Sequence, residues 1–113
     1  RPLLGSGALR GASVNRSPGA YLANPAEERA RHEADGGDVD GEMTVLRLER
    51  ADGRPVGALV WFPVHCTSMN NTNRLVSGDN KGLASRVLEE EAGGGYVAAF
   101  VQANEGDVSP NTR

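Results

Sequence analysis

The stretch that decides the fold is VGALVWFPV, residues 56–64, which is almost entirely apolar. An apolar run of this length, rich in valine and aromatic residues, predicts a β-strand. Because polar and apolar residues do not alternate in it, the strand is expected to be buried on both faces, as in a sheet covered by helices. Pro63 fits the last residues of such a strand better than its middle, since proline donates no hydrogen bond to a neighbouring strand.

On the N-terminal side, residues 43–50 (MTVLRLER) show the alternation that is typical of a second strand. Asp52-Gly53, between the two runs, is a turn signal of the hairpin kind. The sequence therefore predicts that residues 43–50 and 56–64 pair as a hairpin.

On the C-terminal side, residues 81–92 predict a helix, with Asp79 or Asn80 as its cap and a run of three glycines after it. Residues 96–101 (YVAAFV) then predict a short buried strand. A buried strand, a helix and a second buried strand in this order resemble the crossover unit of a parallel or mixed sheet. We therefore expect an α/β fold with a mixed β-sheet and flanking helices.

The remaining segments are expected to be less regular. Asn24-Pro25 followed by acidic residues predicts the start of a short helix, with Asn24 as its cap and Pro25 at its first position. The acidic run from Glu33 to Glu42 should end that helix and form a solvated loop. Residues 1–14, which are rich in glycine and serine, and the polar residues 102–113 are expected to be loops.

Composition and charge exclude several classes of protein. A chain of 113 residues with 38% hydrophobic residues fits one modest domain with a small core. No run approaches the roughly 20 apolar residues that a membrane-spanning helix needs. A net charge of −3 without a basic stripe argues against a nucleic-acid partner. A single cysteine, Cys66, excludes an internal disulfide framework and a cysteine-rich zinc module.

Two polar clusters follow the two buried strands. VHCTSMNN at 64–71 comes after the first strand, and NEGDVSPN at 104–111 comes after the second. Ligands of crossover α/β sheets bind in the crevice at the carboxyl ends of the strands, so both clusters should lie at that edge. The sequence therefore predicts a polar site there.

His65 and Ser109 have the greatest chemical capacity in these clusters. An imidazole can bind a metal through one nitrogen while a carbonyl holds the other, but a hydrogen-bonded core histidine gives the same pattern. His32 lies on the predicted surface helix, so further zinc ligands would have to come from outside the chain. Ser109 needs a base or a metal to become a nucleophile, and an ordinary Asp-x-Ser-Pro turn is the alternative.

Arg16 is a third candidate, in the loop segment NRSP. Its planar guanidinium could hold a carboxylate, a phosphate or a carbonyl oxygen. An exposed arginine without a function is the alternative. The residues alone thus predict an α/β sheet with a polar site at one edge.

Four segments of the chain, taken together and in order, resemble the neutral ceramidase family. They are NRSPGAYLANPAEERAR (15–31), the stretch from Asp38 to Met43, WFPVHCTSMNNTNRLVSGDNKGLAS (61–85) and YVAAFVQANEGDVSPN (96–111). The hexapeptide GDVSPN at 106–111 is the active-site signature of that family. The resemblance extends from about Asn15 to Asn111.

The resemblance implies a zinc-dependent amidase that cleaves the N-acyl bond of ceramide, a membrane-surface lipid, into sphingosine and a fatty acid outside the cell or at its surface. His65 matches a zinc-binding histidine, Ser109 the catalytic serine and Arg16 an arginine that lines the active site. One catalytic zinc is implied, with its other ligands (a histidine, a glutamate and a tyrosine) outside this chain. Because family enzymes are several times longer, residues 1–113 are expected to be an internal fragment of the catalytic domain, with the family-matching region at 15–113.

The sequence leaves three questions open. Ser109 is either the nucleophile or a hydrogen-bond donor to the developing oxyanion. A metal-independent serine amidase, or a non-catalytic α/β module that binds a lipid or a partner, would use the same residues differently. The isolated chain is expected to be inactive and marginally stable, because a sheet edge without its neighbour stays unpaired.

Overall fold

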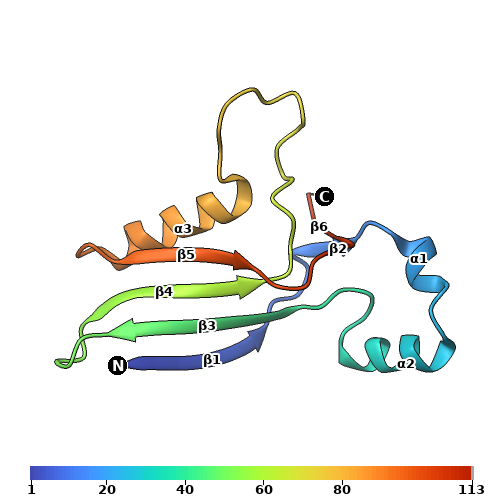
Figure 1. Cartoon of the computed structure of the whole chain (residues 1–113), viewed down its shortest axis with the longest axis horizontal. Helices are drawn as coiled ribbons and strands as arrows, with labels where there is room; N and C mark the ends of the chain where they lie inside the picture. Colours follow the sequence, from blue (N-terminus) through green and yellow to red (C-terminus); the bar gives the residue numbers. More distant parts are fainter. Residues whose placement is uncertain (113) are drawn as a thin grey trace.

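The computed structural model describes residues 1–112 and contains a four-stranded mixed sheet (Figure 1). The strand order is β1 (Pro2–Ala8), β3 (Glu42–Glu49), β4 (Pro55–Phe62) and β5 (Val97–Gln102). β3 is antiparallel to both of its neighbours, β1 and β4, whereas β4 and β5 are parallel. Parallel strands need a crossover, which the helix α3 (Asp79–Ala92) supplies. The predicted α/β class, mixed sheet and crossover unit are confirmed.

The predicted hairpin is also confirmed. Residues of β3 pair in register with those of β4, with Leu46 opposite Leu59, up to an irregularity between Leu48 and Glu49. In the turn, Gly53 has a positive φ of 84°, which glycine adopts without steric cost. The Arg54 backbone N donates to Asp52 Oδ1 at 3.0 Å. Both residues of the Asp-Gly pair therefore stabilise the turn, the glycine by its positive φ and the aspartate by this hydrogen bond.

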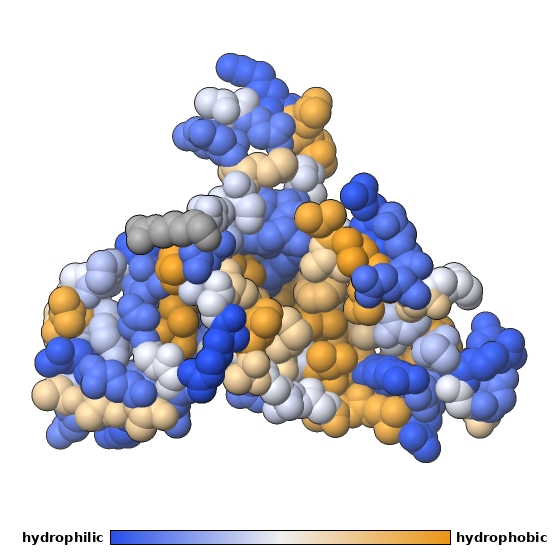
Figure 2. All heavy atoms as spheres, turned by 180° about the vertical axis from the view of Figure 1, so that it is seen from behind, coloured by the Kyte–Doolittle hydropathy of each residue, from blue (hydrophilic) through white to orange (hydrophobic). Residues whose placement is uncertain are grey.

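The expectation that β4 is covered on both faces holds for one face only. Side chains alternate between the faces of a sheet, and Ala58, Val60 and Phe62 on one face of β4 are buried together with Ala98 of β5. On the opposite face, Leu59 and Trp61 of β4 are only half-buried, and apolar side chains reach the molecular surface over the sheet (Figure 2). Leu4, for example, is 74% exposed. Among the described residues, α3 is the helix that packs closely on this sheet, and one helix cannot cover two faces.

Two short strands form a second sheet beside the first. β2 (Ser13–Asn15) and β6 (Val108–Pro110) are antiparallel, with Val14 opposite Ser109. Figure 1 shows this pair next to the carboxyl ends of β4 and β5. The second sheet therefore brings the N-terminal segment to the edge where the polar site is predicted.

The prediction that residues 1–14 and 102–113 are loops is wrong where these strands form. β1 pairs with β3 along its whole length, from Pro2 opposite Leu48 to Ala8 opposite Glu42. Glycine at positions 5 and 7 weakens the local strand signal, but an added Cβ at either would meet nothing within 4 Å, so the segment is an ordinary exposed strand. β1 forms because it pairs with β3, which is distant in sequence, so the residues of β1 themselves do not indicate a strand.

The two predicted helices begin and end close to their predicted positions. α1 (Pro18–Leu22) was not predicted, and α2 (Ala26–Asp35) is the helix expected after Asn24-Pro25. The N-cap of α2 is Pro25 instead of the predicted Asn24, and no side chain caps the helix. α2 extends into the acidic run, so only residues 36–41 remain as a loop. The cap of α3 is Gly78 instead of Asp79 or Asn80.

Gly57, on β4, lies so close to the parallel strand β5 that replacing it should destabilise the fold. A Cβ at Gly57 would collide with the carbonyl oxygen of Val97 on the adjacent strand, and backbone cannot move aside as a side chain can. Gly57→Ala is therefore expected to lower the free energy of unfolding by about 1–3 kcal/mol, as overpacking does. Gly5→Ala is the matched control, because a Cβ there has open space. Urea denaturation tests this, and equal stabilities for the two variants would contradict it.

Candidate active site

His65 is tied to the second sheet through a single carbonyl group. It follows the buried Phe62, Pro63 and Val64 at the end of β4 and is half-buried itself. Its backbone N donates to the carbonyl oxygen of Val108 at 3.1 Å, and its ring Nδ1 lies 2.8 Å from the same oxygen. The strand β6 therefore fixes both the position and the orientation of the imidazole.

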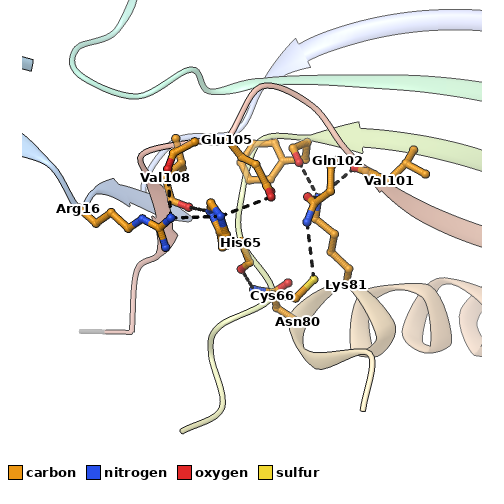
Figure 3. Close-up of polar contacts among 11 residues, drawn as sticks. Arg16, His65, Cys66, Asn80, Lys81, Val101, Gln102, Glu105 and Val108 are labelled. Carbon is orange, nitrogen blue, oxygen red and sulfur yellow. Dashed lines mark hydrogen bonds and ion pairs between the residues drawn. The ribbon is translucent and has the colours of Figure 1, made fainter. Parts of the chain in front are cut away.

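This contact determines which ring nitrogen is available. A carbonyl oxygen can only accept a hydrogen bond, so Nδ1 carries a proton and donates it. In the neutral ring, Nε2 then has a free lone pair, and it faces Arg16 Nη2 at 3.2 Å and Glu105 Oε1 at 3.7 Å (Figure 3). Metal-binding histidines have this arrangement, with one nitrogen held by an acceptor and the other turned to the metal.

Arg16 lies directly against His65 and the GDVSPN segment. Besides its contact with Nε2, Arg16 Nη2 donates to the carbonyl oxygen of Gly106 at 3.1 Å, and its backbone N donates to that of Asp107 at 2.8 Å. The neighbouring Asn15 Nδ2 donates to Asp107 Oδ2 at 3.0 Å. The segment NRSP is thus held to GDVSPN by main chain and side chains together.

Ser109 is positioned by the same strand. It lies in the middle of β6, directly after the Val108 whose carbonyl oxygen binds His65, and it is half-buried. Its side chain is on the opposite face of the strand from the buried Val108. The structure therefore brings Arg16 and His65 into contact and places the backbone of Ser109 one residue after Val108, the hydrogen-bond partner of His65.

Glu105 is a site residue that was named only as part of the polar cluster. Its side chain is 18% exposed, Oε1 faces the His65 imidazole, and Oε2 is buried without a hydrogen-bond partner among the described residues. A carboxylate oxygen buried in this way is costly, so it marks a position where a polar or cationic group fits. The signal in the sequence that could have identified Glu105 is its position, three residues after the end of the buried strand β5.

The start of α3 holds the chain that follows His65. Asn80 Nδ2 donates to the carbonyl oxygen of His65 at 2.9 Å and to Ser68 Oγ at 3.1 Å. The Asp79 carboxylate accepts the backbone N–H groups of Ser68 and Met69 at 2.9 and 2.8 Å. Burial raises the pKa of Asp79. The hydrogen bonds from these two N–H groups and from the backbone N–H of Asn80 lower it by more, so the pKa lies below its usual value.

The comparisons with known proteins agree on one family. The model of the N-terminal part of neutral/alkaline non-lysosomal ceramidase matches residues 3–113. The chain belongs to the neutral ceramidase family. Neutral ceramidase A of Dictyostelium discoideum is 52% identical over 121 residues, and the neutral ceramidase of Pseudomonas aeruginosa is 48% identical over 113 residues. Each alignment covers 98–100% of this chain but 16% of the relative.

Solved ceramidase structures match the fold as well. The crystal structure of neutral ceramidase from Pseudomonas aeruginosa has a TM-score of 0.87 and 49% identity, covering 100% of this chain and 18% of that one. A ceramidase complexed with C2 has a TM-score of 0.85 and 50% identity, covering 98% of this chain and 17% of that one. The mixed α/β fold is therefore that of a segment of a neutral ceramidase.

His65 fits a metal as one ligand of a larger set. Its tautomer leaves Nε2 free, and the half-buried carboxylate of Glu105 adds negative charge beside it. Within residues 1–112, however, no group of three or more His, Cys, Asp and Glu side chains lies close enough to hold a metal ion. Catalytic zinc takes three protein ligands, so the described residues supply only part of such a site.

No helix in the described part of the chain combines the length and the apolar character needed to cross a membrane.

Proposed function

We propose that this chain forms part of the catalytic centre of a zinc-dependent amidase, which hydrolyses the N-acyl bond of ceramide to sphingosine and a fatty acid. The observation that carries the proposal is the contact between His65 and the GDVSPN segment, in which the Val108 carbonyl leaves Nε2 free to bind a cation. Family membership supports the same activity. Since the chain spans 16% of these relatives, we assign the activity to a longer parent protein that contains it.

His65 would hold the zinc ion through Nε2, with further ligands from other parts of the parent protein. A zinc ion there would supply Lewis-acid chemistry, polarising the amide carbonyl for attack. The Val108 carbonyl keeps the His65 ring in the tautomer and orientation that metal binding requires. These roles follow from the contacts of the ring and need no rearrangement of β6.

Arg16 and Ser109 would act on the substrate. Nε2 of His65 has one lone pair, so Arg16 donates to it only while no metal is bound. Released from Nε2, the guanidinium stays anchored by the carbonyl oxygen of Gly106 and can donate to a substrate oxygen. Ser109, held in β6 beside the histidine partner Val108, would attack the carbonyl carbon or donate to the oxygen that develops negative charge.

We further propose that the parent protein works outside the cell or at its surface, on ceramide at a membrane surface. The location outside the cell rests on the family resemblance. The membrane surface rests on the chemistry of the substrate, since a lipid amide with two long chains is presented at a lipid–water interface. The 113 residues alone are expected to show no turnover, because they hold one zinc ligand.

Removal of the metal tests the proposed function. The parent protein is incubated with a chelator, and fatty-acid release from a short-chain ceramide is measured before and after zinc is restored. We expect release to stop with the chelator and to return with about one zinc ion per protein. Full activity in the chelator would instead indicate a metal-independent serine amidase, and ceramide binding without release at any zinc level would indicate a non-catalytic module.

A further inference from the structure

A lysine lies buried where α3 meets the sheet. Lys81, in the first turn of α3, is 7% exposed, although a lysine near a helix start is usually solvated. Its side chain runs toward the carboxyl ends of β4 and β5, beside the segment that carries His65 (Figure 3). The nucleophilic and metal-binding roles proposed above do not use it, so its position needs a separate explanation.

The Lys81 ammonium group binds both parallel strands at once. Nζ donates to the carbonyl oxygen of Phe62 at 2.7 Å, to that of Val101 at 3.0 Å and to Oε1 of Gln102. An ammonium has three donors, and all three are used. Phe62 and Gln102 are the last residues of β4 and β5 and lie opposite each other in the sheet. One cation therefore joins the two strand ends.

Burial of this charge is costly. Desolvation lowers the pKa of Lys81 below its usual value, while the charges of Glu105 and Cys66 act in the opposite direction. The cost of taking a charge out of water offsets much of what its contacts contribute, so a buried charged group is weak evidence for a gain in stability. Fold stability by itself therefore gives little reason to place a lysine here, whereas a fixed geometry at the strand ends does.

The two strand ends lead directly into the active site. His65 lies three residues after Phe62, and Glu105 lies three residues after Gln102. The neighbour of Lys81, Asn80, donates to the carbonyl oxygen of His65. A shift between the ends of β4 and β5 would therefore move the imidazole relative to the segment that faces it.

We infer that Lys81 is a positioning residue of the active site, because its ammonium group joins the carboxyl ends of β4 and β5 and so fixes His65 relative to residues 105–109. The inference rests on the proposed function. Lys81 touches neither the substrate nor the metal in this role. It acts through the backbone carbonyl groups of Phe62 and Val101.

The test replaces Lys81 in the parent protein and measures metal binding and kinetics separately. Lys81→Met keeps the length of the side chain but removes the charge and the donors. We expect it to weaken zinc affinity, measured by competition with a chromogenic chelator, by about 10–100-fold, as loss of a residue that orients a metal ligand does. The kcat for ceramide should fall by a similar factor with little change in KM, and Lys81→Arg should restore most of both.

Arg86→Met is the matched control, because Arg86 is a cation on the same helix with a 69% exposed side chain. It should leave zinc affinity and kcat unchanged. If Lys81→Met fails to fold, Gln102→Met removes the side-chain acceptor of Lys81, together with a long contact from Gln102 Nε2 to Cys66 Sγ at 4.0 Å, and should give the same changes in weaker form. A folded Lys81→Met or Gln102→Met with wild-type zinc affinity and kcat, whatever its thermal stability, would overturn the inference. A wild-type protein without zinc binding or hydrolysis would overturn the proposed function as well.

Discussion

Replacement of Ser109 by alanine in the parent protein is expected to lower the rate of fatty-acid release from ceramide by at least about 100-fold. Removal of one oxyanion donor costs about 10²–10³ in kcat, and loss of a nucleophile costs more. The expectation rests on the position of Ser109 in β6, one residue after the carbonyl group that holds His65. Zinc content should stay unchanged, because the serine is not a ligand.

Ser85→Ala is the control for this prediction. Ser85 lies in the middle of α3, the helix that packs on β5, so its loss should leave the rate of release within a few-fold of wild type. The two variants are compared under single-turnover conditions, which separate the chemical step from product release. Turnover of Ser109→Ala within a few-fold of wild type would exclude the nucleophile role. It would leave the Asp-x-Ser-Pro turn as the sole function of this residue.

The central part of the fold follows from local pattern. The apolar run 56–64, the turn at Asp52-Gly53 and the glycines after residue 92 each act on their own neighbours, and the hairpin, α3 and β5 form where these signals lie. Ligands of crossover α/β sheets bind at the carboxyl ends of the strands, and His65 lies at that end of β4. Local sequence thus carries the crossover unit and the approximate location of the site.

The rest of the fold depends on partners that are distant in sequence. β1 is held by residues some 40 positions away, and β2 by β6 almost 100 positions away, so neither strand stands out in its own segment. Both were expected to be loops. The contact of Arg16 with His65 depends on the β2–β6 pair, so spacing alone could not show it.

The buried cation was likewise beyond sequence reasoning. A lysine in a helix that begins with polar residues normally lies in water, and only the combined ends of β4 and β5 create three acceptors for Lys81. The resemblance to neutral ceramidases, by contrast, rests on short motifs that can be recognised in the sequence without knowing how the chain packs. The match to the family model over residues 3–113 confirms that part.

The central claim is that His65 Nε2 binds the catalytic zinc. His65→Ala in the parent protein is expected to weaken zinc affinity by more than about 100-fold, since residues that only orient a zinc ligand already contribute about 10–100-fold. His32→Ala is the matched control, because the other histidine lies exposed on α2, where its ring packs edge-on to Tyr21 at 6.5 Å between ring centres.

The most direct measurement is the zinc dissociation constant of the two histidine variants and the wild type, obtained by chelator competition on metal-stripped protein. The account predicts wild-type affinity for His32→Ala and loss of tight binding for His65→Ala. Equal zinc affinity in wild type and His65→Ala would contradict it.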